Sequence, residues 1–184
     1  MPKTALVILA EGFEEVEAIA PVDVLRRAGV RVTLAGVNAL TVKSSRNIGV
    51  QAEALLKDIQ DLPDAVILPG GLPGAANLAK SEEVSKLVKK MNAAGKLVAA
   101  ICAAPAVVLA PLGILDGKKA TCYPGCERDF SSKTGHVQER VVVDGNIITS
   151  QGPGTAFEFA LEIAIQLVGK AMADNVRGQM LIKV

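Results

Sequence analysis

The chain has 184 residues, half of them hydrophobic and only 3% aromatic, and its 20 basic side chains nearly balance 19 acidic ones. This length suits one domain with a large core, and the even charge, without a basic stripe, excludes recognition of a nucleic-acid backbone as a main role. Three cysteines do not form the disulfide framework of a secreted protein, so we expect a cytoplasmic location, with the nucleus or mitochondria also open in a eukaryote.

The first third of the chain predicts a βαβ unit. Residues 4–10 form an apolar run that suits a strand and is too short for the core of a signal peptide. A helical pattern follows over about residues 14–28 and is closed by Gly29, and a second strand is expected at 30–37. The elements expected next are a small hairpin of residues 40–43 and 48–53 and a short helix at 55–62.

The middle of the chain predicts two buried strands with a helix between them. The first strand, residues 64–69, is followed by a helix over 81–94, and the second strand starts after Gly95. Residues 97–115 carry no charge, which is nominally enough to span a membrane, but Pro105 and Pro111 favour a buried strand followed by a buried helix. We therefore expect no membrane segment.

The last third predicts a hairpin and two helices. The expected elements are a short strand at 120–123, a polar loop or helical turn at 126–133, a hairpin at 140–150 turning at Asp144-Gly145, a break at 152–154, a strong helix at 155–168 and a weaker one at 172–181. Alternating strands and helices without a repeat predict a single α/β domain over residues 1–184, with a doubly wound, mostly parallel sheet and helices on both faces. Ligands bind such sheets at the carboxyl ends of the strands, where we expect residues 11–17, 70–74 and 102–105 to meet.

Cys102 is the strongest candidate for chemistry because it lies at the turn between a predicted strand and a predicted helix. Pro105 fits the first helical turn. The free N–H groups and the positive end of a helix dipole would face the sulfur and favour thiolate over thiol. The alternative is that Cys102 is a small apolar core residue, as many free cysteines are.

Glycines and glutamates at the same edge supply further candidate groups. Gly70 and Gly71 allow close approach of the backbone, so the N–H of Gly71 and that of Ala103 can bind a developing oxyanion, or the glycines form a tight turn with no ligand. Glu14 and Glu17 lie one helical turn apart. A carboxyl group beside a thiolate in an enclosed site stays protonated and can exchange protons, whereas other glutamates at a helix start only complement the dipole.

The remaining candidates are weaker. His136 is the one histidine and lies in a polar stretch, so a peptidase-like Cys–His pair depends on it alone. Cys122 and Cys126 have neither a second cysteine pair nor a histidine close in sequence, so we interpret them as ordinary thiols and expect no metal. Arg46 is either a solvated charge or an anion contact near the site.

Five segments resemble one known family across nearly the whole chain. They are ALVILA at 5–10, EEVE at 14–17, LPGG at 68–71, AAICA at 99–103 and TSQGPGT at 149–155. Together they resemble the ThiJ/PfpI superfamily, and most closely its Parkinsonism-associated deglycase branch. The resemblance implies a flavodoxin-like fold, a homodimer, no cofactor, and a reactive cysteine on a strained elbow beside a protonated glutamate.

By motif match, the resemblance assigns Cys102 as nucleophile, Glu17 as that glutamate, and Gly71 and Ala103 as oxyanion donors. The further candidates for the rim of the site are Glu14, Gly70, Arg46, Tyr123 and Pro153. Three positions depart from some relatives: Tyr123 stands where several have a histidine, Ser44 where some have a cysteine, and Gln151 where some have an arginine. A role for that histidine as a base is therefore not expected here.

The resemblance also implies a choice of activities. Family members are described as cofactor-independent glyoxalases that convert methylglyoxal to lactate, as deglycases of aldehyde-modified proteins and nucleotides, and as peroxide sensors. We expect an enzyme that processes small aldehydes or glycated groups through Cys102 and protects against oxidative stress. The alternative is a non-enzymatic redox sensor or chaperone that acts through oxidation of Cys102 to sulfinate.

Overall fold

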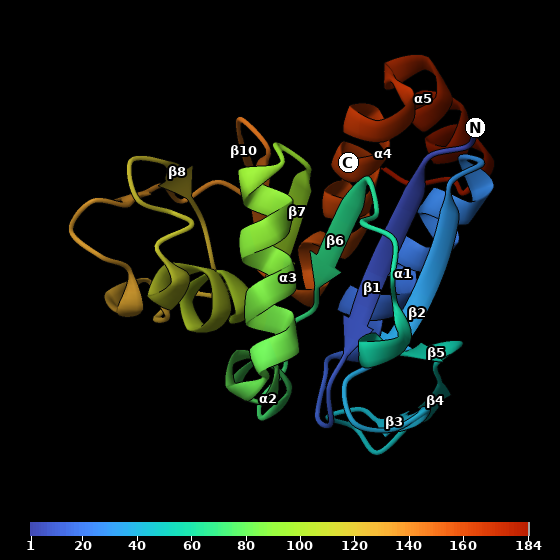
Figure 1. The fold of residues 1–184 in the computed structure, drawn as a ribbon. Coiled ribbons are helices and arrows are strands. Elements are labelled where there is room, and N and C mark those ends of the chain that lie inside the picture. The colour runs from blue at the N-terminus through green and yellow to red at the C-terminus, as the bar shows by residue number, and fades with distance from the viewer. Residues whose placement is uncertain (184) are drawn as a thin grey trace.

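The computed structural model describes residues 1–183 and is built on a seven-stranded sheet (Figure 1). In spatial order the strands are β10 (Val141–Asp144), β11 (Ile147–Ser150), β7 (Leu97–Ile101), β6 (Ala65–Leu68), β1 (Thr4–Leu9), β2 (Arg31–Gly36) and β5 (Ala54–Leu55). All neighbours pair in parallel except β10 and β11, which form the predicted hairpin. The predicted α/β class with a mostly parallel sheet is confirmed.

Helices cover both faces of the sheet. On one face lie α1 (Glu15–Arg27), α4 (Ala156–Val168) and α5 (Lys170–Gln179), and on the other lie α2 (Gly74–Lys80) and α3 (Glu82–Ala93). Successive residues of β1 alternate between the two cores: Val7 packs against α1, and Leu6 and Ile8 face the α3 side. Because both faces of these strands are buried, their sequences are continuous runs of apolar residues.

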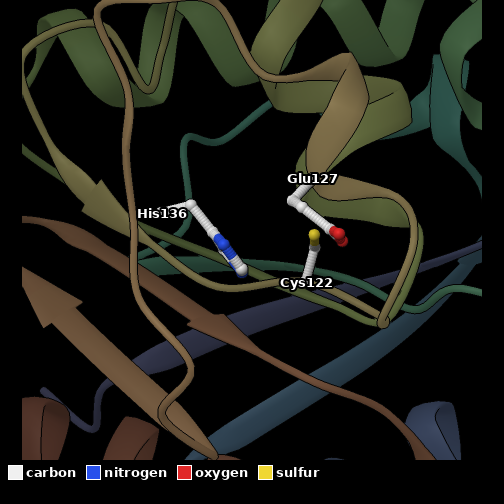
Figure 2. A group of neighbouring side chains, drawn as sticks. All are labelled: Cys122, Glu127 and His136. Atoms are coloured by element: carbon white, nitrogen blue, oxygen red, sulfur yellow. The ribbon is translucent and has the colours of Figure 1, made fainter.

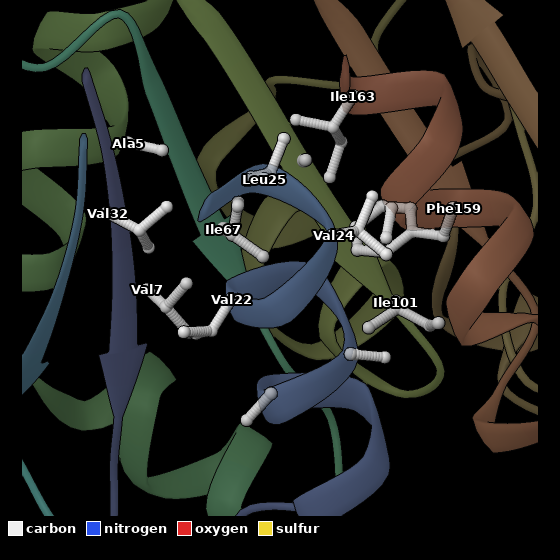
Figure 3. Packing of buried hydrophobic residues seen from close by; sticks show 14 of the residues in the cluster. Ala5, Val7, Val22, Val24, Leu25, Val32, Ile67, Ile101, Phe159 and Ile163 are labelled. Atoms are coloured by element: carbon white, nitrogen blue, oxygen red, sulfur yellow. The ribbon is translucent and has the colours of Figure 1, made fainter. Parts of the chain in front are cut away.

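The core between the sheet and α1 is mostly aliphatic, with two fully buried aromatic rings, Phe13 and Phe159. Figure 3 shows Val7, Ile67 and Ile101 from the strands beneath Val24 of α1 and Phe159 of α4. All five are fully buried. This packing fixes α1 against the sheet, and α1 carries the predicted site glutamate.

The helix α1 begins and ends where its sequence predicts. The Glu14 side chain accepts a hydrogen bond from the N–H of Glu17, which caps the first turn. Gly29 follows the last turn with φ +79°, a conformation that glycine adopts without strain. The matching predictions for β1, β2, β6, β7, α3, α4 and α5 agree with the structure to within about two residues at most ends.

The structure corrects two predicted helices and adds one that was not predicted. The helix expected at 55–62 is the edge strand β5 followed by a single 3₁₀ turn, Leu56–Asp58. The helix α2 was not predicted, because Pro73 precedes it without a side-chain cap. The helix expected after Cys102 is a π turn, Pro105–Leu109, and a 3₁₀ turn, Ala110–Leu112, because Pro111 has no N–H to continue an α-helical ladder.

Two small sheets lie outside the main one. The hairpin of β3 (Thr41–Lys43) and β4 (Gly49–Gln51) is confirmed. The strand expected at 120–123 is instead β8 (Lys119–Ala120), which pairs with β9 (Gly135–His136). Within residues 1–183, no helix is both long enough and apolar enough to cross a membrane, and the uncharged run 97–115 is divided between β7 and short turns.

Candidate active site

Three loops meet beyond the carboxyl ends of neighbouring parallel strands. β1, β6 and β7 are adjacent, and the chain order reverses between β1 and β6, which is where doubly wound sheets bind ligands. The N–H of Glu14 donates to the Gly70 carbonyl oxygen (3.1 Å), and the N–H of Gly74 donates to the Gly12 carbonyl oxygen (3.1 Å). The predicted convergence of residues 11–17, 70–74 and 102–105 is confirmed.

Cys102 stands directly after β7 in a conformation that residues other than glycine rarely adopt. Its φ is +65°, and its exposed fraction is 9%. The N–H of Cys102 donates to the Ser150 carbonyl oxygen (2.9 Å), and its own carbonyl accepts from the Tyr123 N–H (2.8 Å). These bonds hold the backbone in its strained turn, which is common at functional sites.

Glu17 is fully buried beside Cys102. Its Oε2 accepts a hydrogen bond from the Gly70 N–H (2.8 Å), and its carboxyl group lies close to the Cys102 thiol. Its Oε1 has no partner among the described protein atoms. Burial, with a smaller effect of the Glu14 charge, raises the pKa of Glu17 to about 7, so a large share of this carboxyl is protonated at neutral pH.

The electrostatics of Cys102 differ from the expectation that its turn alone favours a thiolate. Burial and the neighbouring Glu17 raise the pKa of the Cys102 thiol to about 12, and hydrogen bonds from the Gly71 and Ala103 N–H groups oppose this rise. The π turn that follows is too short for a strong dipole. Two adjacent buried acids do not ionise together, so Cys102 becomes a thiolate only when Glu17 holds the proton.

The positions of Gly70 and Gly71 after β6 leave no room for a side chain, because neighbouring atoms lie too close to the backbone there. A Cβ on Gly70 would lie 2.6 Å from Cys102 Cβ and 2.8 Å from Glu17 Oε2. Gly71 has φ +86°, and a Cβ there would lie 2.6 Å from the Glu14 backbone nitrogen. The N–H groups of Gly71 and Ala103 lower the pKa of the Cys102 thiol, and donors of this kind can also stabilise an oxyanion on a sulfur-bound carbon.

The predicted rim residues occupy different positions. The Glu14 side chain serves as the cap of α1. Tyr123 is half exposed, and its ring lies over Gly152, which also approaches Glu17 Oε1. Pro153 is exposed at the start of a 3₁₀ turn on that side.

Two other predicted residues lie elsewhere. Arg46 is exposed in the turn between β3 and β4, where its N–H donates to Glu15 Oε1 (3.2 Å), so this bond ties the hairpin to α1 rather than to Cys102. His136, on which the peptidase interpretation depends, is exposed on β9 and lies beside Cys122, a different cysteine.

Ser150 and Thr155 support the site but were not singled out from the sequence. Both are buried, and their hydroxyl oxygens are 2.6 Å apart. Thr155 also bonds the Gly152 backbone, accepting from its N–H (3.1 Å). These bonds fix the loop that holds the Cys102 N–H. The sequence signal that could have indicated these two residues is the run of small and polar residues at 149–155, at the end of a buried strand.

Comparison with known proteins agrees with this geometry. The family model described as DJ-1/PfpI family matches residues 3–166. The "Parkinson disease protein 7 homolog" of Danio rerio is 44% identical over 186 residues, covering 98% of each chain. The "Glutathione-independent glyoxalase DJR-1.2" of Caenorhabditis elegans is 39% identical over 177 residues, covering 94% of this chain and 93% of the relative.

A solved structure confirms the fold as well. "Toxoplasma gondii DJ-1, oxidized" superposes with a TM-score of 0.96 at 38% identity, covering 99% of this chain and 100% of that one. The family match covers most of the chain, and both the sequence identity and the fold extend over nearly its whole length. The chain therefore belongs to the DJ-1/PfpI family.

Proposed function

We propose that this protein is a cofactor-independent glyoxalase, a hydro-lyase or hydrolase that acts on methylglyoxal or on aldehyde-modified groups. The observation that carries the proposal is the buried contact between the Cys102 thiol and the Glu17 carboxyl, with the Gly71 and Ala103 N–H groups directed at the sulfur. A family relative that bears the name glyoxalase supports it. The enclosed sulfur favours a small aldehyde as substrate.

The residues account for a balanced reaction. With the proton on Glu17, the Cys102 thiolate adds to the aldehyde carbon, and the carbonyl electron pair moves to oxygen, where the Gly71 and Ala103 N–H groups stabilise it. Glu17 gives its proton to that oxygen, which forms a hemithioacetal and leaves Glu17 as a carboxylate. The carboxylate then takes the proton of the former aldehyde carbon and returns it to the neighbouring carbon, while the hydroxyl proton passes to the neighbouring oxygen, which leaves a thioester. Water cleaves the thioester and releases lactate and the free thiol, so no external oxidant or cofactor is consumed.

Replacing Cys102 by serine is expected to lower lactate formation from methylglyoxal by at least about 10³-fold, because the nucleophile is lost. Lactate release by rigorously purified protein is the measurement. Cys126→Ser is the matched control, since Cys126 is only partly buried and lies outside the site. Turnover that persists in Cys102→Ser would contradict the proposal.

A redox function is the second candidate, favoured by the relative whose structure is described as oxidized. In this case Cys102 forms a sulfinate, and the change alters partner binding or chaperone action without turnover. Mild peroxide is then expected to add two oxygens at Cys102 alone, as read by intact-mass and peptide mass spectrometry. Equal oxidation of Cys126 would count against this candidate, and absence of turnover above Cys102→Ser would favour it.

We also propose a homodimer that uses an apolar patch beside the site. The exposed members of this α1 patch, with their exposed fractions, are Val16 (44%), Ile19 (39%), Ile48 (53%) and Phe157 (42%). They surround a surface hollow that α1, the β3–β4 hairpin and α4 share. A second copy of the chain would cover this face and shield the helix that carries Glu17.

Val16→Asp is expected to convert the dimer to a monomer, because it places a charge in the apolar patch. Sedimentation velocity is the measurement. Leu72→Asp is the control, since Leu72 is 68% exposed but lies outside the α1 patch. A wild-type protein that sediments as a monomer would contradict the dimer, and a dimer that persists in Val16→Asp would contradict this interface.

A further inference from the structure

Away from Cys102, the fold gathers three metal-binding side chains that are scattered in the sequence. Atoms of Cys122, Glu127 and His136 that can each act as a ligand lie within 4.8 Å of one another. Figure 2 shows the Cys122 sulfur beside the Glu127 carboxylate, with the His136 ring approaching from the opposite side. No histidine lies close to Cys122 in the sequence, but the pairing of β8 with β9 brings His136 to that cysteine in the fold.

We propose that Cys122, Glu127 and His136 bind one Zn²⁺ ion, with water as the fourth ligand. A thiolate, an imidazole and a carboxylate are the protein ligands that Zn²⁺ uses, at about 2.0–2.3 Å from the ion. Such a site needs its ligand atoms about 3.5 Å apart, so only a small closure of the cluster is required. His136 is exposed and Glu127 half-buried, which leaves both side chains room to move.

The surroundings of the cluster favour a cation with a preference for sulfur. Glu127 Oε2 accepts the Gly125 N–H (2.6 Å), which holds the carboxylate near the sulfur, and the Phe130 ring packs edge-on to His136 at 6.0 Å between centroids. The charged or titratable groups around the cluster are Cys126, Arg128 and Asp129, of which only Arg128 is positive. A thiolate ligand favours Zn²⁺ over Mg²⁺ or Ca²⁺, which prefer oxygen.

Binding is expected to release a proton. Zn²⁺ binds cysteine as the thiolate, so coordination requires the Cys122 sulfur to lose its proton. Coordination removes that proton, because the ion stabilises the thiolate directly.

The site would join a segment that has little regular structure. Its ligands come from the residues after β8, from the 3₁₀ turn Glu127–Asp129 and from β9, and both of these strands have two residues. Tyr123 follows Cys122 and donates its N–H to the Cys102 carbonyl. A bound ion would thus fix the segment that borders the candidate active site, although it lies outside that site.

The test measures Zn²⁺ binding to the full-length protein by competition with a chromophoric chelator, and records the spectrum with Co²⁺ in place of Zn²⁺. We expect one ion per chain and a thiolate-to-cobalt charge-transfer band. His136→Gln, an exposed position where folding is not at risk, should weaken Zn²⁺ binding more than about 100-fold, the upper end of what loss of an outer-shell partner costs. Cys122→Ser should also abolish the charge-transfer band.

Matched controls separate this site from the other thiols. Cys126→Ala and Cys102→Ala should each bind one Zn²⁺ with wild-type affinity and keep the cobalt band. Loss of binding in Cys102→Ala with retention in His136→Gln would overturn the proposal and place the ion at the active site. Absence of stoichiometric binding to the wild type would overturn it too. None of these measurements depends on turnover, so they test the Zn²⁺ site independently of the proposed glyoxalase activity.

Discussion

Glu17→Gln is expected to lower methylglyoxal turnover by about 10²–10⁴-fold, the usual contribution of a general acid or base. Glutamine keeps the size of the side chain and can still accept the Gly70 N–H, but it cannot take up or return a proton. Cys102 should therefore remain open to alkylation by iodoacetamide while turnover is lost. Glu82→Gln on α3 is the control, and its activity should equal that of the wild type.

The same substitution should change how stability depends on pH. Folding raises the pKa of Glu17 from 4.5 to about 7, so the folded protein binds more protons than the unfolded chain between these values. Wild-type stability should therefore fall as the pH rises from about 4.5 to 7, by about 3 kcal/mol in all. Glu17→Gln removes this loss.

Urea denaturation at pH 5 and pH 8 measures the effect. The free energy of unfolding of Glu17→Gln minus that of the wild type should be larger, by about 2.5 kcal/mol, at pH 8 than at pH 5. Equal pH dependence in the two proteins would show that Glu17 ionises normally in the fold. Full turnover by Glu17→Gln would remove this residue from the proposed mechanism.

Gly70→Ala is expected to destabilise the protein by about 3 kcal/mol, the upper end of the range for overpacking, and to abolish activity. The new methyl group would lie 2.6 Å from Cys102 Cβ and 3.0 Å from the Ile101 carbonyl oxygen. Both atoms belong to β7 and its strained turn, so neither can move aside cheaply. The clash pushes directly on the carbon that carries the nucleophilic sulfur.

Thermal unfolding and lactate release are the measurements for this variant. The control is Gly178→Ala in α5, where a methyl group meets no atom within 4 Å. Alanine favours a helix over glycine by up to about 1 kcal/mol, and less in the last turn where Gly178 lies, so the control should melt at the same or a slightly higher temperature and keep full activity. Wild-type stability and turnover in Gly70→Ala would show that the turn is looser than this packing implies.

The elements predicted correctly are those whose signals are local. The strand β7 is indicated by its apolar run, α3 by the Ser81 cap, and α1 by its closing Gly29. A strand buried on both faces requires consecutive apolar residues, and a helix end requires a capping residue, so both features are visible in neighbouring positions of the sequence. The elements β5 and α2 are short and have no such sequence signal. Their existence depends on the sheet edge and the loop against which they lie.

The sequence by itself determined the α/β class, the turn that carries Cys102, and the edge where Glu17 and the glycines meet, because the carboxyl ends of neighbouring parallel strands lie together. Only the tertiary structure decided the ionisation of the site, since the pKa of Cys102 depends on burial and on a carboxyl 85 positions away in the chain. It also decided that His136 lies beside Cys122. Dielectric surroundings and contacts between distant segments arise only when the chain packs, and no local pattern encodes them.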